Sequence, residues 1–145
     1  MRTTCPFARG ALLFLSVALA AACGVEQKRS GLPPEAQAAI DAITADLARG
    51  DYEKIYAEAA EEWRQAARAD ESRANLERIR TSLGNVLSRA QLSANEVLAG
   101  VTEHTLSVSY NTKFERADAI ETFALVERSG RWRLARYAVN SNALR

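Results

Sequence analysis

Through the middle of the chain, hydrophobic residues recur every three or four positions, which is the spacing of helices that bury one face. Three helices are expected: the first from Pro34 to a stop at Gly50, the second after an N-cap at Asp51, and the third from Asp70 or Ser72. The positions expected to face inward are Ala36, Ala39, Ile40, Ile43, Leu47, Tyr52, Ile55, Tyr56, Ala59, Trp63, Leu76, Ile79 and Leu83.

From Leu87 onward the hydrophobic period changes to the alternation of half-buried strands. Residues 87–98 are predicted as a strand with an irregularity near Ser93, and residues 105–114 alternate cleanly. Residues 119–139 contain two β-rich runs on either side of Ser129-Gly130, which is a hairpin signal. We therefore expect four antiparallel strands.

The register of these strands defines which face is buried. Leu125 is expected opposite Leu134, Phe123 opposite Arg136, and Tyr110 on the neighbouring strand opposite Phe123. The resulting apolar face carries Leu106, Val108, Tyr110, Phe114, Phe123, Leu125, Trp132 and Leu134. The predicted class is α+β over residues 34–145, with three N-terminal helices packed on a curved antiparallel four-stranded sheet.

The N-terminal segment, residues 1–22, has the pattern of a secretory signal peptide. It begins with basic residues and continues with an apolar run too short for the ~20 residues of a membrane-spanning helix. The sequence Ala20-Ala21-Ala22-Cys23 resembles the lipobox of bacterial lipoproteins. The resemblance implies cleavage before Cys23 and acylation of that residue, and Gly24 favours the outer membrane, facing the periplasm. The alternative is ordinary cleavage that leaves Cys23 free.

Residues 23–33 are predicted as a flexible tether, polar and ending in Gly and Pro, that would keep the domain within ~35 Å of the bilayer. Cys5 would leave with the signal peptide and Cys23 would carry lipid, so the mature domain would have no thiol. Removal of two arginines lowers Lys plus Arg from 19 to 17, against 18 Asp plus Glu. No basic stripe is present, so nucleic acid is not expected as a partner.

The order of helices and strands resembles the cystatin-like cone of the nuclear-transport-factor-two-like superfamily, and more narrowly its small bacterial envelope domains of unknown function. The residues that carry this resemblance are Gly50-Asp51-Tyr52, Trp63, Leu83-Gly84, residues 107–114 and Gly130-Arg131-Trp132-Arg133. The superfamily includes isomerases, dehydratases and binding modules, so the resemblance implies a fold without deciding a function.

Cone enzymes place their catalytic groups in the pocket between the helices and the sheet. The candidate pocket residues here are Tyr56, Trp63, Tyr110, Glu121, Phe123, Trp132 and Arg136. An ion pair between Glu121 and Arg136 is expected, either as a base with an anion anchor or, more simply, as a salt bridge at the open end of the sheet. His104 is expected in an exposed loop. We assign no catalytic residue, metal site or cofactor.

Two functions from different classes remain open. The first is a lipid-anchored, non-enzymatic module that binds a partner or an apolar small ligand, and the second is a small pocket enzyme of isomerase or dehydratase type. The outer sheet face adds a possible homodimer contact through Ile120, Val126, Tyr137 and Val139. The alternative to that dimer is a monomer whose long side chains cover the patch.

Overall fold

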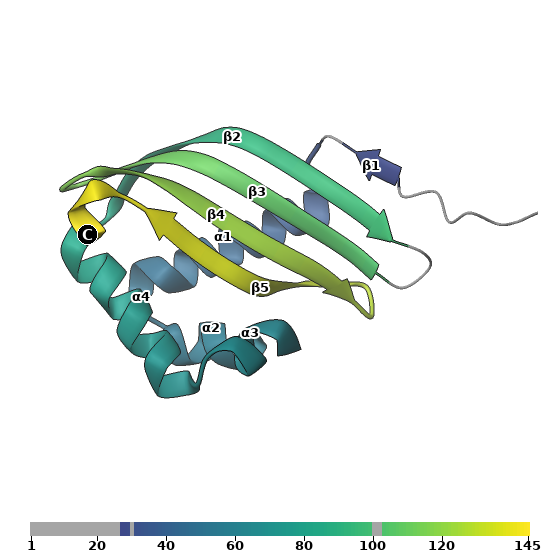
Figure 1. The fold of residues 1–145 in the computed structure, drawn as a ribbon, viewed down its shortest axis with the longest axis horizontal. Coiled ribbons are helices and arrows are strands. Elements are labelled where there is room, and N and C mark those ends of the chain that lie inside the picture. Colours follow the sequence, from purple (N-terminus) through teal and green to yellow (C-terminus); the bar gives the residue numbers. More distant parts are fainter. Residues whose placement is uncertain (1–26, 30, 100–102) are drawn as a thin grey trace, which may run out of the picture.

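The structure is a computed structural model that describes residues 27–29, 31–99 and 103–145. The predicted signal peptide and Cys23 lie outside the described residues. Helices cover one face of a curved, open antiparallel sheet, and the predicted α+β class is confirmed (Figure 1). Within the described part of the chain, the helices are all too short or too polar to cross a bilayer.

The elements follow one another in a simple order along the chain. The helices are α1 (Pro34–Arg49), α2 (Tyr52–Glu58), α3 (Glu61–Ala66), α4 (Ala69–Leu83) and a final 3-10 turn, η1 (Asn142–Leu144). The strands are β1 (Gln27–Arg29), β2 (Val86–Ala99), β3 (Glu103–Phe114), β4 (Asp118–Arg128) and β5 (Arg131–Asn140). They lie in this sequence order across one sheet, so that each long strand pairs with its neighbours in the chain.

The end of α1 agrees with its sequence signal. Gly50 has φ of 78°, a left-handed conformation that glycine adopts without strain. Its N–H donates to the carbonyl of Leu47 at 3.2 Å, and the N–H of Asp51 donates to that of Asp46 at 3.0 Å. These two bonds form a Schellman motif, which explains the helix stop at the predicted residue.

The second predicted helix is interrupted at Ala59 and Ala60, both of which have extended backbone conformations. The N–H of Ala60 donates to the carbonyl of Leu134 on β5 at 2.9 Å, and both alanines are at most 2% exposed. This contact with the sheet outweighs the helix propensity of the surrounding Ala- and Glu-rich run. Two short helices, α2 and α3, result.

The N-cap of α4 is Arg68, so the predicted start at Asp70 or Ser72 was wrong. Glu71 accepts a hydrogen bond from the backbone N–H of Arg68 at 3.1 Å, as in half of a capping box. Ser72 is buried and accepts a hydrogen bond from Nε1 of Trp63 at 2.9 Å. The hydroxyl that resembled a cap therefore satisfies the buried indole.

Two strand boundaries differ from the sequence expectation. β3 begins at Glu103, so His104 lies in a strand and the prediction of an exposed loop position was wrong. Within the predicted tether, residues 27–29 form β1, in which Gln27 pairs with Leu98 near the end of β2. Both differences extend the sheet toward the same end, where β2 finishes and β3 begins (Figure 1).

The pairing of β3 with β4 differs by two residues from the predicted register. Tyr110 pairs with Glu121, and Val108 pairs with Phe123. Side chains alternate between the faces with a period of two, so an even shift leaves the predicted inward face unchanged. The inward hydrophobic residues of these strands are at most 7% exposed, namely Leu106, Val108, Tyr110, Phe114, Phe123 and Leu125.

In the terminal hairpin, Leu125 pairs with Leu134 as predicted, but an irregularity follows immediately. Beyond it Phe123 pairs with Tyr137, so the predicted pairing with Arg136 was wrong. The extra residue on β5 reverses which side chains point inward. Tyr137 enters the core at 9% exposure, whereas Arg136 is exposed to solvent.

Because the side chains of β5 reverse direction at this irregularity, the residues that the sequence suggested for a homodimer contact do not share one face. Tyr137 belongs to the core and Val139 packs against it. Val126 is 6% exposed, so of the four residues only Ile120, at 41%, presents a large exposed side chain. The four residues therefore do not form one continuous apolar patch.

The core lies between the helices and the sheet, with Phe123 at its centre and fully buried. Trp132, expected in the core, is half-buried at the edge of this cluster. The buried cluster extends from Ala36 to Tyr137 along the chain. Every described residue of this cluster lies within residues 24–145, which we choose for measurements in solution.

Candidate functional site

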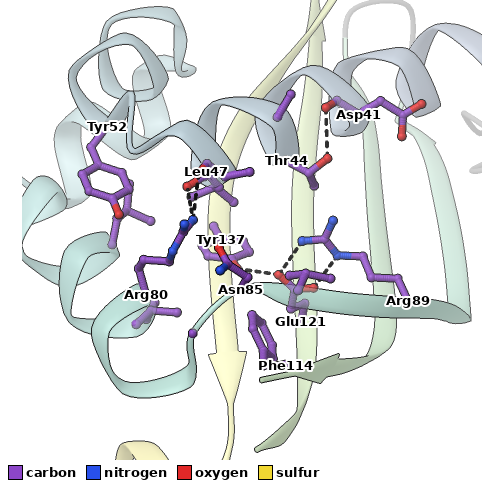
Figure 2. Close-up of a pocket in the computed structure, with 16 residues that line it drawn as sticks. Asp41, Thr44, Leu47, Tyr52, Arg80, Asn85, Arg89, Phe114, Glu121 and Tyr137 are labelled. Carbon is purple, nitrogen blue, oxygen red and sulfur yellow. Dashed lines mark hydrogen bonds and ion pairs between the residues drawn. The ribbon is translucent and has the colours of Figure 1, made fainter. Parts of the chain in front are cut away.

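A cavity of about 400 Å³ lies between α1, α4 and the sheet, close to the start of β2 (Figure 2). Its apolar wall is formed by Leu47, Tyr52, Leu76, Ile79, Val86 and Phe114. Its polar wall is formed by Asp41, Thr44, Arg80, Asn85, Arg89, Glu121 and Tyr137. A cavity of this size that combines an apolar wall with convergent polar groups is typical of small-molecule sites.

Glu121 of β4 is the buried charge of this cavity, with 0% exposure. Its Oε1 accepts hydrogen bonds from the hydroxyl of Tyr137 at 2.6 Å and from Nη2 of Arg89 at 3.0 Å. Its Oε2 accepts from Nε of Arg89 at 2.6 Å and from the hydroxyl of Thr112. Figure 2 shows the two-pronged contact between Arg89 and Glu121 and the bond to Tyr137. Such a bidentate pair fixes the orientation of both groups.

This network limits what the carboxylate can do chemically. A carboxylate has about four acceptor positions, and the four bonds to Glu121 occupy them. Burial, followed by the charge of Glu121, raises the pKa of Tyr137 well above its usual value, so this hydroxyl stays a donor. Glu121 therefore has no acceptor position available for a substrate proton.

Arg89 of β2 presents the unused polar group of the site. Its Nε and Nη2 bind Glu121, its guanidinium lies 5.8 Å from the centre of the Phe123 ring, and Nη1 makes no hydrogen bond within the described residues. In Figure 2 the guanidinium lies between Glu121 and Thr44 of α1. The free edge of Arg89 is thus available to a molecule in the cavity.

The turn between β3 and β4 fixes Asn85, which lines the edge of the cavity. Glu115 accepts hydrogen bonds from the backbone N–H of Asn85 at 2.9 Å and from its Nδ2 at 2.8 Å. These bonds, the backbone one first, lower the pKa of Glu115. Gly84 has φ of 80°, and a Cβ there would come within 2.4 Å of the Glu115 carboxylate. Glycine is therefore required where the chain leaves α4.

A family model described as "Protein of unknown function (DUF4019)" matches residues 38–137. The chain belongs to this family. The matched region of the DUF4019 domain extends from α1 into β5 and includes Arg89, Glu121 and Tyr137. A search of curated proteins found no match.

The DUF4019 domain places Glu121 in the cavity, as the sequence predicted, but with a different cation. Its partner is Arg89 on β2, while Arg136 points to solvent and does not form the predicted ion pair. Arg89 was missed because β2 has register shifts between Val86 and Ser88 and between Gln91 and Ser93, which obscure its alternation. The only sequence signal was an arginine within a weakly alternating strand.

The five aromatic candidates do not line this cavity of the DUF4019 domain. The hydroxyl of Tyr56 donates to the carbonyl of Ala67 at 3.2 Å, and the edge of Tyr110 contacts Phe123 with ring centres 5.9 Å apart. Trp63 packs in the helical layer, and Trp132 lies near His104 instead. None of the five side chains therefore occupies the cavity.

His104 forms a second polar cluster in the DUF4019 domain, at the far end of the sheet. One imidazole nitrogen contacts the carboxylate of Glu127 and the other that of Glu96. Trp132 lies edge-on to the ring, with centres 4.5 Å apart. Both nitrogens thus face carboxylates, and no group of His, Cys, Asp and Glu in the described part of the domain is arranged to hold a metal ion. His104 ties three strands together.

Proposed function

We propose that this DUF4019 protein is a lipid-anchored module of the bacterial envelope that binds a small molecule without transforming it at Glu121. The observation that carries the proposal is an open cavity in which Glu121, the one fully buried carboxylate among the described lining residues, has all its acceptor positions occupied. A general base needs a free acceptor position within reach of the proton it removes. Binding is therefore the better supported of the two functions that the sequence left open.

The envelope location is part of this proposal and is supported by the signal-peptide pattern and the lipobox-like Cys23. Only three residues separate Cys23 from Gln27, which pairs with Leu98. An acylated Cys23 would therefore hold the end of β2 within about 15 Å of the bilayer. The cavity lies near the other end of β2, about 30 Å away along the strand from Leu98 to Arg89. Its ligand would then be taken up away from the membrane surface.

Binding is tested with a neutral fluorescent probe, N-phenyl-1-naphthylamine, on residues 24–145. We expect saturable binding of about one probe per chain, because the apolar wall should exclude water from the dye. Substitution Ala48→Trp places a large ring at the cavity wall and should weaken binding at least tenfold. Ala57→Trp, on the exposed surface of α2, is the matched control and should leave binding unchanged.

Absence of saturable binding, or equal loss in the Ala48→Trp and Ala57→Trp variants, would refute binding in this cavity. Retained affinity with Ala48→Trp would do the same. Urea unfolding of both variants establishes that each retains the fold while the comparison is made.

The anchor is tested separately by Cys23→Ser in the complete chain. We expect the unaltered protein in the membrane fraction, with residues 1–22 removed, because at least two acyl chains give stable attachment. The variant should no longer be processed and anchored in this way. The matched control is Cys5→Ser, which lies in the segment that is removed and should change nothing. A Cys23→Ser protein that is still processed and still membrane-bound would contradict the lipid anchor.

A further inference from the structure

We infer that the cavity at Arg89 binds an uncharged, mainly apolar molecule that presents one acceptor oxygen, a carbonyl or a hydroxyl, to Nη1 of Arg89. This inference rests on the proposed binding function and specifies the ligand of the same cavity. It follows from three properties of the walls: an unused donor, a balanced set of charges and an extensive apolar surface.

The unused donor is Nη1 of Arg89. The other two guanidinium nitrogens, Nε and Nη2, both donate hydrogen bonds to Glu121. The Arg89 side chain is 21% exposed and lines the cavity. A hydrogen bond to a charged donor contributes more than one between neutral groups. We therefore expect the ligand to present an acceptor atom to Nη1 of Arg89.

The balance of charges on the walls favours an uncharged ligand. The cavity is lined by two carboxylates, Asp41 and Glu121, and by two guanidiniums, Arg80 and Arg89, so their formal charges cancel. Arg80 already donates to the carbonyls that end α1, at 3.1 and 3.0 Å. Because these charges balance, the walls offer no net attraction to offset the loss of hydration of an ionic ligand, and a cation would find no free acceptor position on Glu121. An uncharged molecule meets neither penalty.

The apolar wall determines the rest of the molecule. Tyr52, Leu76 and Ile79 from the helices are all at most 9% exposed and line the cavity. Phe114 lines it from β3. Contact with these side chains favours a hydrocarbon or aromatic body, since burial of apolar surface is favourable. The single polar group of the ligand is expected at the end nearest Arg89.

The test uses three ligands of similar shape that compete with N-phenyl-1-naphthylamine for residues 24–145. They are 1-ethylnaphthalene, which has no acceptor; 1-acetylnaphthalene, which has one carbonyl; and 1-naphthoate, which is an anion. We expect the ketone to bind about tenfold more tightly than the hydrocarbon and than the carboxylate, the factor of one charge-assisted hydrogen bond.

The variant Arg89→Lys assigns this preference to the guanidinium. Lysine can keep a cation beside Glu121, but it lacks the second edge of the guanidinium, so the preference for the ketone should fall below threefold. Arg136→Lys, on the exposed side of β5, is the matched control and should keep the tenfold preference. The three-ligand comparison on the unaltered protein decides the ligand class even if Arg89→Lys fails to fold.

Each outcome of this experiment has a distinct meaning. Equal affinity for the ketone and the hydrocarbon, or a preference that survives in Arg89→Lys, refutes the role of Nη1 while binding itself stands. Tightest binding of 1-naphthoate refutes an uncharged ligand. If neither the probe nor any of the three compounds binds, the proposed function fails and this inference fails with it.

Discussion

Substitution Arg89→Met is expected to lower the free energy of unfolding by about 3–5 kcal/mol, one of the two largest effects that we predict for this protein. Glu121 is fully buried, and Arg89 supplies two of its four hydrogen bonds and the opposite charge. Methionine fills similar space but leaves the carboxylate without a cation. Urea unfolding of residues 24–145, followed by tryptophan fluorescence, measures the change.

The matched control is Arg136→Met, which removes the arginine that the sequence had suggested as the partner. Arg136 is exposed, so its loss should change the unfolding free energy by less than about 0.5 kcal/mol. In the double variant Arg89→Met/Glu121→Gln, removal of the uncompensated charge should recover a large part of the loss. Similar losses for Arg89→Met and Arg136→Met would show that the ion pair does not contribute as described.

Substitution His104→Leu is expected to lower the unfolding free energy by about 3 kcal/mol. The side chain of Glu96 is 7% exposed, and its carboxylate contacts one nitrogen of His104. Leucine preserves an apolar contact with Trp132 but leaves this buried carboxylate without its partner. The same urea measurement on residues 24–145 applies.

Two further variants separate the buried contact from the outer one. Glu127 is 32% exposed, so Glu127→Gln should cost less than His104→Leu, because solvent can replace the lost contact. In the double variant His104→Leu/Glu96→Gln, a neutral amide replaces the stranded charge and part of the loss should be recovered. If His104→Leu unfolds at the same urea concentration as the unaltered protein, the imidazole is not a stabilising link between the strands.

The sequence predicted those features of the fold that depend on local chemistry. The stop of α1 at Gly50 follows from the freedom of glycine to adopt positive φ, and the hairpin at Ser129-Gly130 from the same property. The inward face of β3 and β4 follows from alternation, which survives a shift of two residues. These signals lie within a few residues of the structure that they specify.

The errors came from contacts between distant segments. Ala60 leaves the helix because its N–H binds Leu134 of β5, and Ser72 is a partner of Trp63 rather than a helix cap. The bulge on β5 places Tyr137, instead of the predicted Arg136, on the inner face. None of these partners is adjacent in sequence, so a local pattern contains no information about them.

The candidate site shows the same division. The inward position of Glu121 could be obtained from the period of two along β4, because that alternation is local and strong. Its cation, Arg89, comes from a strand with two register shifts, and only the assembled sheet places it 2.6 Å from Glu121. Whether the Glu121 carboxylate keeps a free acceptor position depends on which side chains of three other strands donate hydrogen bonds to it. The sequence by itself thus determined the class of fold and the buried charge, whereas the tertiary structure alone decided its partners, because cross-strand pairing is set by the packing of the whole domain.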